Sequence, residues 1–562
     1  MNSGSDKPVI AVVTNQISEW QVPILEQFSK LLGVRGYRLL CISGGAITYT
    51  SSSDNRIQKT DKAIYESISS YEVTAFILLT GTIGNHELEN ELVDFVRPFR
   101  RKPVISFGAN VSGVSSVVVD NIDSMRSLME HMTADPDHKR FVFIRGYPNV
   151  IDSIQREQVF RETLLRKNIA VEESLIINGN FSATDSYYEL DQILQDNLDI
   201  DAVVAANDPM ALNAIHALHK YGLRVPEDVI VSGFDNGWAA VDSVPPLTTV
   251  NYSLSSRVNA AVEELFRQIE RGDSCSNDSR VLLFPGTLVV RGSSRTRNSS
   301  EQIGDLRKPV FDALDFKECL KSSLKDLRKP HGASAAAVID DVVAMLVNGS
   351  EINGTELSAA LEQFRAYPED VFWWRHLHNQ IGSLLQNYGP EGQSPVALRL
   401  ISKILTQIHE GIWNIESEES YRRLKHHETK HGIRQTLAAA NDHDSFKEAI
   451  ALAAQKLNCP RWYICLYKTP GTVPDTEASL YFSSPNVDDV EYESHFSING
   501  ILPGNYVDYF SSENYLIVQP LSVGGIQYGY MVLEMDEQTY FDVRSLAESV
   551  CSTLVRIRIE DK

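Results

Sequence analysis

Short apolar runs alternate with amphipathic segments over residues 8–292. Ile10–Thr14 predicts a strand, Val22–Gly33 a helix, and Arg38–Ile42 the next strand. Strands separated by helices predict right-handed βαβ crossovers and mainly parallel sheets. Roughly ten strands exceed one comfortable sheet, so we expect two lobes with a cleft between them. The other predicted strands are 75–80, 103–107, 117–119, 141–145, 175–178, 202–206 and 229–234.

The pattern changes after the polar stretch Arg295–Glu301, whose composition is typical of a linker. Helical spacing over Val310–Tyr421 predicts a helical bundle, and the polar segment Glu416–Ala440 predicts a connecting helix. The pattern of the last segment, residues 445–559, predicts an α+β domain in which helices flank an antiparallel sheet. Its expected helices are 446–457 and 540–559, and its expected strands are 461–467, 478–482, 515–520 and 527–534. The expected divisions are 1–295, 296–415, 416–440 and 441–562.

Composition narrows the class of protein. A chain of 562 residues that is 43% hydrophobic predicts several globular domains. A net charge of -22 argues against nucleic-acid binding, which depends on Lys and Arg neutralising phosphates. The short polar N-terminus, the lack of a long apolar run, and six scattered cysteines without metal-ligand spacing favour a cytoplasmic protein that contacts no membrane.

Polar side chains follow two of the predicted strands. Asn207-Asp208 comes directly after the run 202–206, and Asp235-Asn236 follows the run 229–234. The carboxyl ends of parallel strands meet at one edge of a sheet, where ligands bind in the adjoining crevice. The alternative is that these side chains cap the following helices. We favour a small-molecule cleft because both strand ends face the same crevice.

Several short segments, taken in their order and spacing, resemble the effector-binding domain of lactose-repressor-type (LacI/GalR) regulators, which is itself similar to periplasmic sugar-binding proteins. They are Asp120-Asn121, Arg156 with Phe160, the segment 207–211, Gly222 with Val225-Pro226, and the segments 233–236, 246–250 and 288–293. The resemblance implies two similar lobes joined by three crossing segments, a dimer, and closure on a sugar-like or nucleobase-like effector.

The resemblance also assigns the effector contacts, and the chemistry agrees. Arg gives a rigid fork of donors, Asp and Asn bind hydroxyls, and an aromatic face packs on a ring. Each residue also has a purely structural alternative. Asp120 could cap a helix, Arg156 could be a surface charge, and Phe181 could pack in a loop. The contacts fall on Asp120, Arg156, Phe181, Asn207 and Asp235, with Asn15 and Trp20 added by their position in the first strand-to-helix loop.

The chain departs from that family at both ends. A family member carries a helix-turn-helix module before the first strand, whereas this strand begins almost at the N-terminus, so we expect no direct DNA binding by this chain. The segment 441–562 looks like a GAF-type fold, as in multidomain bacterial sensors with a C-terminal output. We therefore expect an output domain or partner protein; the alternative is the sensor portion of a signalling enzyme such as a diguanylate cyclase.

Catalytic and metal-binding patterns are missing from the sequence: we find no nucleophile elbow, P-loop, HExxH or zinc spacing. The segment Gly81-Thr82-Ile83-Gly84 lacks the full phosphate-binding spacing and predicts a simple loop. We expect no cofactor, no metal and no enzymatic activity. The expected function is sensing of a small polar metabolite that feeds a transcriptional or signalling output; an enzyme built on the α/β lobes is the remaining alternative.

Overall fold

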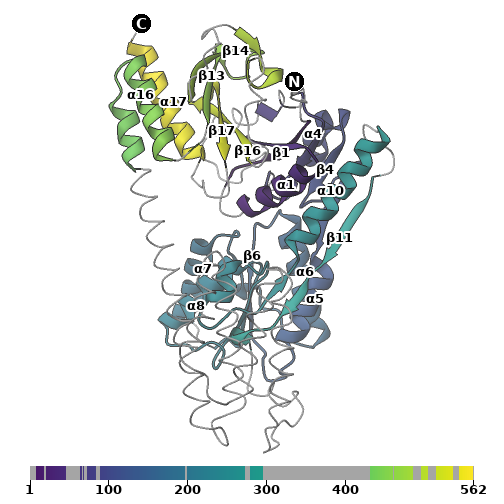
Figure 1. Cartoon of the computed structure of the whole chain (residues 1–562). Coiled ribbons are helices and arrows are strands. Elements are labelled where there is room, and N and C mark those ends of the chain that lie inside the picture. The colour runs from purple at the N-terminus through teal and green to yellow at the C-terminus, as the bar shows by residue number, and fades with distance from the viewer. Residues whose placement is uncertain are drawn as a thin grey trace, which may run out of the picture.

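Two parallel sheets dominate the first half of the chain (Figure 1). The computed structural model describes residues 8–17, 21–45, 64–65, 68, 72–83, 89–196, 199–272, 279–294, 431–457, 459, 461–484, 495–503, 514–535 and 543–560. The predicted helical bundle, most of the predicted connecting helix and Trp20 lie outside these residues.

The first lobe is built on strands that are apolar along almost their whole length. Helices α1 (Val22–Val34) and α10 (Leu254–Arg271) cover one face of its sheet, and α4 (Glu89–Val96) covers the other. Because both faces are covered, the strands are buried on both sides, as in other parallel sheets. The strands are β1 (Val9–Thr14), β2 (Arg38–Ser43), β3 (Ala75–Leu78), β4 (Val104–Phe107), β5 (Ser115–Asp120) and β11 (Val281–Pro285), paired in parallel in the order β11-β5-β4-β3-β1-β2.

The second lobe has a four-stranded parallel sheet in the order β7-β6-β8-β9. Its apolar strands and helices share one buried core. The strands are β6 (Phe141–Arg145), β7 (Ile176–Asn178), β8 (Ala202–Ala205) and β9 (Ile230–Ser232). The helices are α5 (Asn121–Met132), α6 (Ile151–Arg166), α7 (Ala183–Asp196), α8 (Asp208–Lys220) and α9 (Trp238–Asp242).

The chain crosses between the lobes three times. It leaves the first lobe where β5 ends and α5 begins, and returns from β10 (Thr249–Asn251) into α10. The third crossing leads from β11 to β12 (Thr287–Val289), which pairs with β10 in an antiparallel ribbon. Two lobes with parallel sheets and interlobe crossings agree with the expected α/β class.

The last part of the chain forms an antiparallel sheet in the order β16-β17-β13-β14-β15. Its elements lie close to their predicted positions, so its α+β character is as expected. The helices are α16 (His443–Lys456) and α17 (Val543–Glu560), and the strands are β13 (Trp462–Gly471), β14 (Glu477–Ser484), β15 (His495–Ser497), β16 (Tyr515–Val523) and β17 (Ile526–Met535).

This C-terminal unit joins the sheet of the first lobe. Strand β16 pairs in parallel with β2, so that Ile517 lies opposite Cys41 and Val518 opposite Ile42. The result is one continuous sheet of eleven strands. One apolar cluster likewise extends from the face under α1 and α10 to the face under α16 and α17. The sequence pattern predicts a separate domain here and gives no sign of this pairing.

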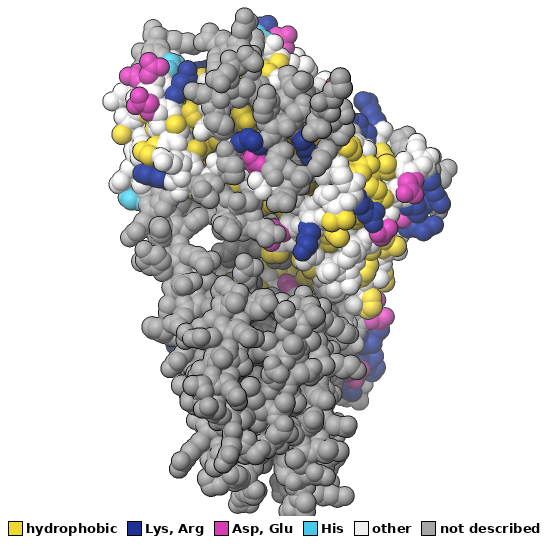
Figure 2. Space-filling view, in the orientation of Figure 1, with side chains coloured by type: hydrophobic (Ala, Val, Ile, Leu, Met, Phe, Trp, Pro, Cys, Tyr) yellow, Lys and Arg dark blue, Asp and Glu magenta, His cyan; other side chains and the backbone are white. Residues whose placement is uncertain are grey.

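The surface of the described residues is mixed in charge. On the face shown in Figure 2, basic, acidic and hydrophobic side chains are interspersed over the described part, and no continuous basic stripe is visible there. None of the described helices has both the length and the apolar character that a bilayer crossing requires.

Candidate ligand-binding site

A cavity of about 250 Å³ lies between the two lobes. The first lobe contributes the ends of β3 and β4, and the second lobe contributes α6 and the residues that follow β7, β8 and β9. The start of α10, at the second crossing, completes the wall. The lining residues are Leu79, Gly81, Thr82, Phe107, Gly108, Val119, Val150, Asp152, Arg156, Phe181, Asn207, Asp235, Tyr252 and Arg257.

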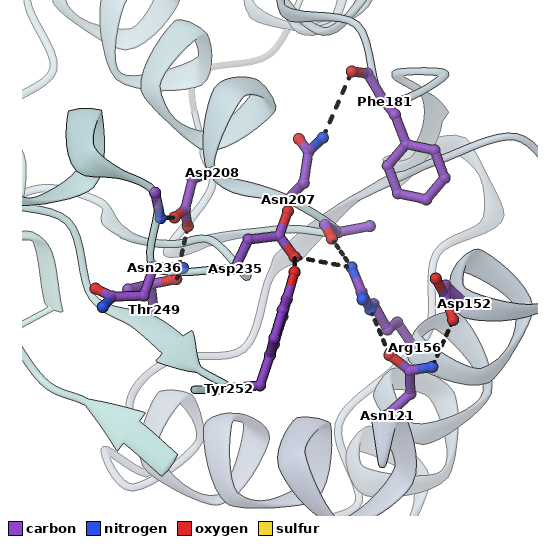
Figure 3. Close-up of polar contacts among 12 residues, drawn as sticks. Asn121, Asp152, Arg156, Phe181, Asn207, Asp208, Asp235, Asn236, Thr249 and Tyr252 are labelled. Atoms are coloured by element: carbon purple, nitrogen blue, oxygen red, sulfur yellow. Dashed lines mark hydrogen bonds and ion pairs between the residues drawn. The ribbon is translucent and has the colours of Figure 1, made fainter. Parts of the chain in front are cut away.

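Arg156 projects from α6 into the floor of this cavity, and its side chain is only 5% exposed. Its Nε donates to Asn121 Oδ1 at 2.9 Å, and its Nη1 donates to the carbonyl of Ala206 at 2.5 Å (Figure 3). The guanidinium also lies over the Phe234 ring, 3.8 Å from the ring centroid. These contacts fix the guanidinium in one orientation, as recognition of a polar ligand requires.

Asp235 follows β9 and points into the same space. Tyr252 donates its hydroxyl to Asp235 Oδ1 at 2.9 Å, and Arg156 Nη1 lies 3.7 Å from the same oxygen (Figure 3). Burial raises the pKa of Asp235 to about 6, although the positive charge of Arg156 and the Tyr252 hydrogen bond oppose the rise. The carboxylate is thus ionised at neutral pH and close to titration.

Asn207 and Phe181 form the opposite wall. Asn207 is the N-cap of α8: its Oδ1 accepts from the backbone N–H of Met210 at 3.0 Å, and its Nδ2 donates to the Phe181 carbonyl at 3.5 Å. The Phe181 ring packs so closely on Gly146 that a Cβ at position 146 would lie 2.2 Å from it. Asn207 therefore both caps its helix and lines the cavity.

Backbone strain is concentrated at the cavity. Six non-glycine residues have positive φ among the described residues, and four of them lie beside the site: Asn180 (52°), Phe181 (54°), Asp235 (112°) and Asn236 (53°). Such conformations cost free energy and persist where the surrounding structure enforces them, often at functional sites. Here they turn Phe181 and Asp235 toward the cavity at the ends of β7 and β9.

Asp208 supports this edge from behind. Its Oδ2 accepts from the backbone N–H of Gly237 at 2.7 Å, and its Oδ1 accepts from the Thr249 hydroxyl at 2.6 Å (Figure 3). Burial, followed by the nearby charge of Asp235, raises the pKa of Asp208 to about 8. Asp208 anchors the loop after β9 to the crossing strand β10 but does not line the cavity.

The predicted site residues divide into two groups. Arg156, Phe181, Asn207 and Asp235 line the cavity together. Asp120 is absent from its lining and caps α5, accepting from the N–H of Asp123 at 3.0 Å. Asn15 is also absent from the lining, and its Oδ1 accepts from Thr14 and Gln21.

Several cavity residues were not predicted from the sequence. Tyr252 and Arg257 enter at a crossing segment, and Asp152 lies one turn before Arg156 on α6. Gly81 and Thr82, expected in a simple loop, belong to the short helix α3 (Thr80–Ile83) and line the cavity. The only available signal for Asp152 was its spacing of four from Arg156, which places both on one helix face.

The chemistry of the lining is that of a binding site. Carboxylates, an amide and two guanidinium groups offer acceptors and donors around a ring-sized space flanked by Phe107, Phe181 and Tyr252. Among the described residues, no group of three or more His, Cys, Asp or Glu side chains is placed to hold a metal ion.

A comparison with known families matches part of the chain. Residues 131–294 match the family described as periplasmic binding protein-like domain. This part of the chain is similar to that family. The match covers the second lobe from the end of α5 onward, the crossings that follow it and the α10 helix.

The similar proteins are transcriptional regulators. The chain is 36% identical over 138 residues to the regulator CelR of Thermobifida fusca, covering 25% of this chain and 40% of the relative. It is 33% identical over 184 residues to the repressor PurR of Histophilus somni strain 129Pt (32% and 54%) and 31% identical over 156 residues to the regulator AscG of Escherichia coli K12 (28% and 45%). The chain spans about half the length of these relatives.

Two solved structures of transcriptional regulators are similar to part of the chain. The Escherichia coli repressor AscG superposes with a TM-score of 0.42 at 23% identity, covering 51% of this chain and 98% of that one. A CelR–cellobiose complex gives a TM-score of 0.41 at 25% identity, covering 51% and 84%. The family match over residues 131–294 does not extend to the C-terminal unit.

Proposed function

We propose that this protein is a ligand-sensing regulator that binds a small polar metabolite, sugar-like or nucleobase-like, between its two lobes. The observation that carries the proposal is the convergence of Arg156, Asn207 and Asp235 on one interlobe cavity. The similarity of the chain to transcriptional regulators also supports it.

The lining suits a ligand with several hydroxyl or N–H groups. Asp235 and Asp152 accept hydrogen bonds, Asn207 both accepts and donates, and the Phe181 ring provides an apolar face. A volume of about 250 Å³ lies near the lower end of small-molecule pockets, roughly 300–1,000 Å³. The ligand we propose is therefore about the size of one or two rings.

Signal transmission follows from the shared sheet. A ligand that contacts both lobes shifts them toward the closed arrangement. The size of this shift equals the difference between its binding free energies for the closed and the open arrangement. The C-terminal unit, which we propose to be GAF-like, pairs with β2 of the first lobe through β16. Lobe closure would therefore move this unit relative to the second lobe and present a changed surface to an output domain or partner. A homodimer, as in the resembling regulators, is part of this proposal.

A thermal-shift screen of the full chain tests the binding proposal. Monosaccharides, disaccharides and nucleobases are added to wild type, Asp235→Asn and the control Asp137→Asn, which lies on the exposed surface. Asn tolerates the positive φ at position 235 as well as Asp does, so this change removes the charge without straining the backbone.

We expect a hit to raise the Tm of wild type and of Asp137→Asn, and most of the shift to be lost in Asp235→Asn. A hit whose shift is equal in all three proteins would contradict the proposed site. Full-length wild type that responds to no member of these classes would contradict the proposed ligand class.

A further inference from the structure

Arg257 is a buried cation that the proposed site does not yet explain. It lies in the first turn of α10, after the N-cap Ser253, and it lines the interlobe cavity. Only 4% of the residue is exposed, and its Nε has no hydrogen-bond partner among the described residues. A buried guanidinium N–H without a hydrogen-bond acceptor is costly, so the retention of Arg257 calls for a reason.

Two aromatic rings hold the Arg257 guanidinium in place. Its Cζ lies 4.7 Å from the centroid of Phe107, at the end of β4, and 4.7 Å from the centroid of Tyr252. Stacking on ring faces orients a guanidinium but leaves its N–H donors at the edge of the plane unsatisfied. The first lobe and the crossing segment thus fix the group and leave its donors for something else.

The neighbouring carboxylates are engaged with other groups. Asp235 accepts from Tyr252 and lies beside Arg156, and Asp152 accepts from Asn121 at 2.8 Å. Both carboxylates act on Arg257 at longer range, yet burial is the dominant influence and lowers its pKa. No ion pair to Arg257 lies within 4.0 Å among the described residues.

We propose that Arg257 determines ligand specificity by binding an anionic oxygen group of the metabolite. This inference rests on the proposed function and narrows its ligand class. The planar fork of N–H donors in Arg matches the geometry of a carboxylate or phosphate. An anion both neutralises the buried positive charge and accepts hydrogen bonds from these donors. Because Asp152 and Asp235 line the same cavity, the rest of the ligand carries hydrogen-bond donors. A sugar phosphate or a sugar acid has this combination.

The first test uses inorganic phosphate and the full chain. The Tm is measured in sodium phosphate and in sodium chloride at equal ionic strength for wild type, Arg257→Gln and the control Arg271→Gln. Arg271 is exposed at the other end of α10. We expect phosphate to raise the Tm of wild type and of Arg271→Gln more than that of Arg257→Gln. Equal shifts in all three proteins would overturn the inference.

The second test compares glucose, glucose 6-phosphate and glucuronate by calorimetry. We expect at least one anionic compound to bind wild type more tightly than glucose, and its affinity to fall roughly 10- to 100-fold in Arg257→Gln. Tighter binding of glucose 6-phosphate would identify the anionic group as a phosphate, and tighter binding of glucuronate would identify it as a carboxylate. Arg257→Lys keeps the charge without the fork, so we expect intermediate affinity.

Glucose binding that depends on Asp235 but not on Arg257 would overturn this inference and leave the proposed function intact. Phosphate binding that depends on Arg257 alone, without any metabolite binding that depends on Asp235, would contradict the proposed function instead.

Stability without ligand separates this role from a structural one. If Arg257 is kept to bind a ligand, Arg257→Gln removes a buried positive charge that no carboxylate neutralises. We then expect the Tm measured without ligand to stay level or to rise. If Arg257 has only a structural role, the Tm should fall clearly in Arg257→Gln and be restored in Arg257→Lys. Ligand affinity should then be unchanged in the variant that folds.

Discussion

Arg156 and Asp235, which come from a helix and from the end of a strand, place opposite charges 3.7 Å apart at the interlobe cavity. Tyr252 donates to the same Asp235 oxygen, so the second carboxylate oxygen remains for a ligand donor. The pair is thus a preorganised acceptor whose strength depends on the ionisation of Asp235.

Ligand affinity should consequently depend on pH. Because the pKa of Asp235 is about 6, lowering the pH from 7.5 to about 5 protonates the acceptor, and we expect affinity for a ligand with hydroxyl or N–H donors to weaken by roughly tenfold or less. Calorimetry across this range checks the expectation. In Asp235→Asn the affinity should be low and flat with pH; a wild-type affinity that does not change between pH 5 and 7.5 would contradict this reading.

Asp208 should make the folded protein less stable at alkaline pH. Its pKa is about 8 in the folded state against an ordinary value of 3.8, so the folded state binds the proton more tightly. That contribution is complete below about pH 3.8 and is lost as the pH rises through 8, at about 1.4 kcal/mol per pKa unit.

The variant Asp208→Asn tests this relationship. The introduced amide keeps the shape of the carboxyl group without its charge, and its oxygen accepts from the Gly237 N–H as Asp208 does. The Tm of wild type should fall relative to that of Asp208→Asn between pH 6 and pH 8.5. Parallel Tm curves for the two proteins over this range would contradict a folded-state pKa near 8 for Asp208.

Gly146 should tolerate no side chain. A Cβ at this position would lie 2.2 Å from the Phe181 ring, which itself is held at positive φ. We expect Gly146→Ala to displace Phe181, weaken ligand binding, and cost about 1–3 kcal/mol of unfolding free energy by overpacking. The matched control is Gly432→Ala, where nothing lies within 4 Å. Denaturant unfolding of both variants measures the difference; equal stability would refute the close contact.

The junction between β2 and β16 should protect a thiol. Cys41 is fully buried opposite Ile517, and burial raises the pKa of its thiol. In Ile517→Asp we expect faster labelling of Cys41 by a thiol reagent, mapped by mass spectrometry, because a charge at this position disrupts the pairing. Ile526→Asp, at a position 38% exposed on β17, is the control and should leave Cys41 protected. Unchanged labelling in a folded Ile517→Asp would argue against the junction.

Much of the fold could be predicted from the sequence because strand and helix periods are local. The apolar runs before Asn207 and Asp235 gave both the strands and the edge at which polar groups gather. Spacing alone, however, does not give the direction of a side chain. Asp120 and Asn15 also lie at the ends of strands, yet Asp120 accepts from the helix that it caps and Asn15 accepts from the nearby Gln21.

The remainder depends on contacts between distant segments. Arg257 sits three residues into an amphipathic helix, where a charge usually faces water, and only the position of Phe107 turns this place into a cavity wall. The pairing of Cys41 with Ile517 has no local signal either, because any apolar edge strand could accept another.

The late arrival of β16 affects how the protein is made. During synthesis β2 emerges early, and its outer edge has no partner until residues 515–523 leave the ribosome. An apolar strand with an open edge invites pairing with other chains, and contacts between remote segments form slowly. Shortened versions that stop before β16 should therefore be prone to aggregate during expression even when both lobes have folded.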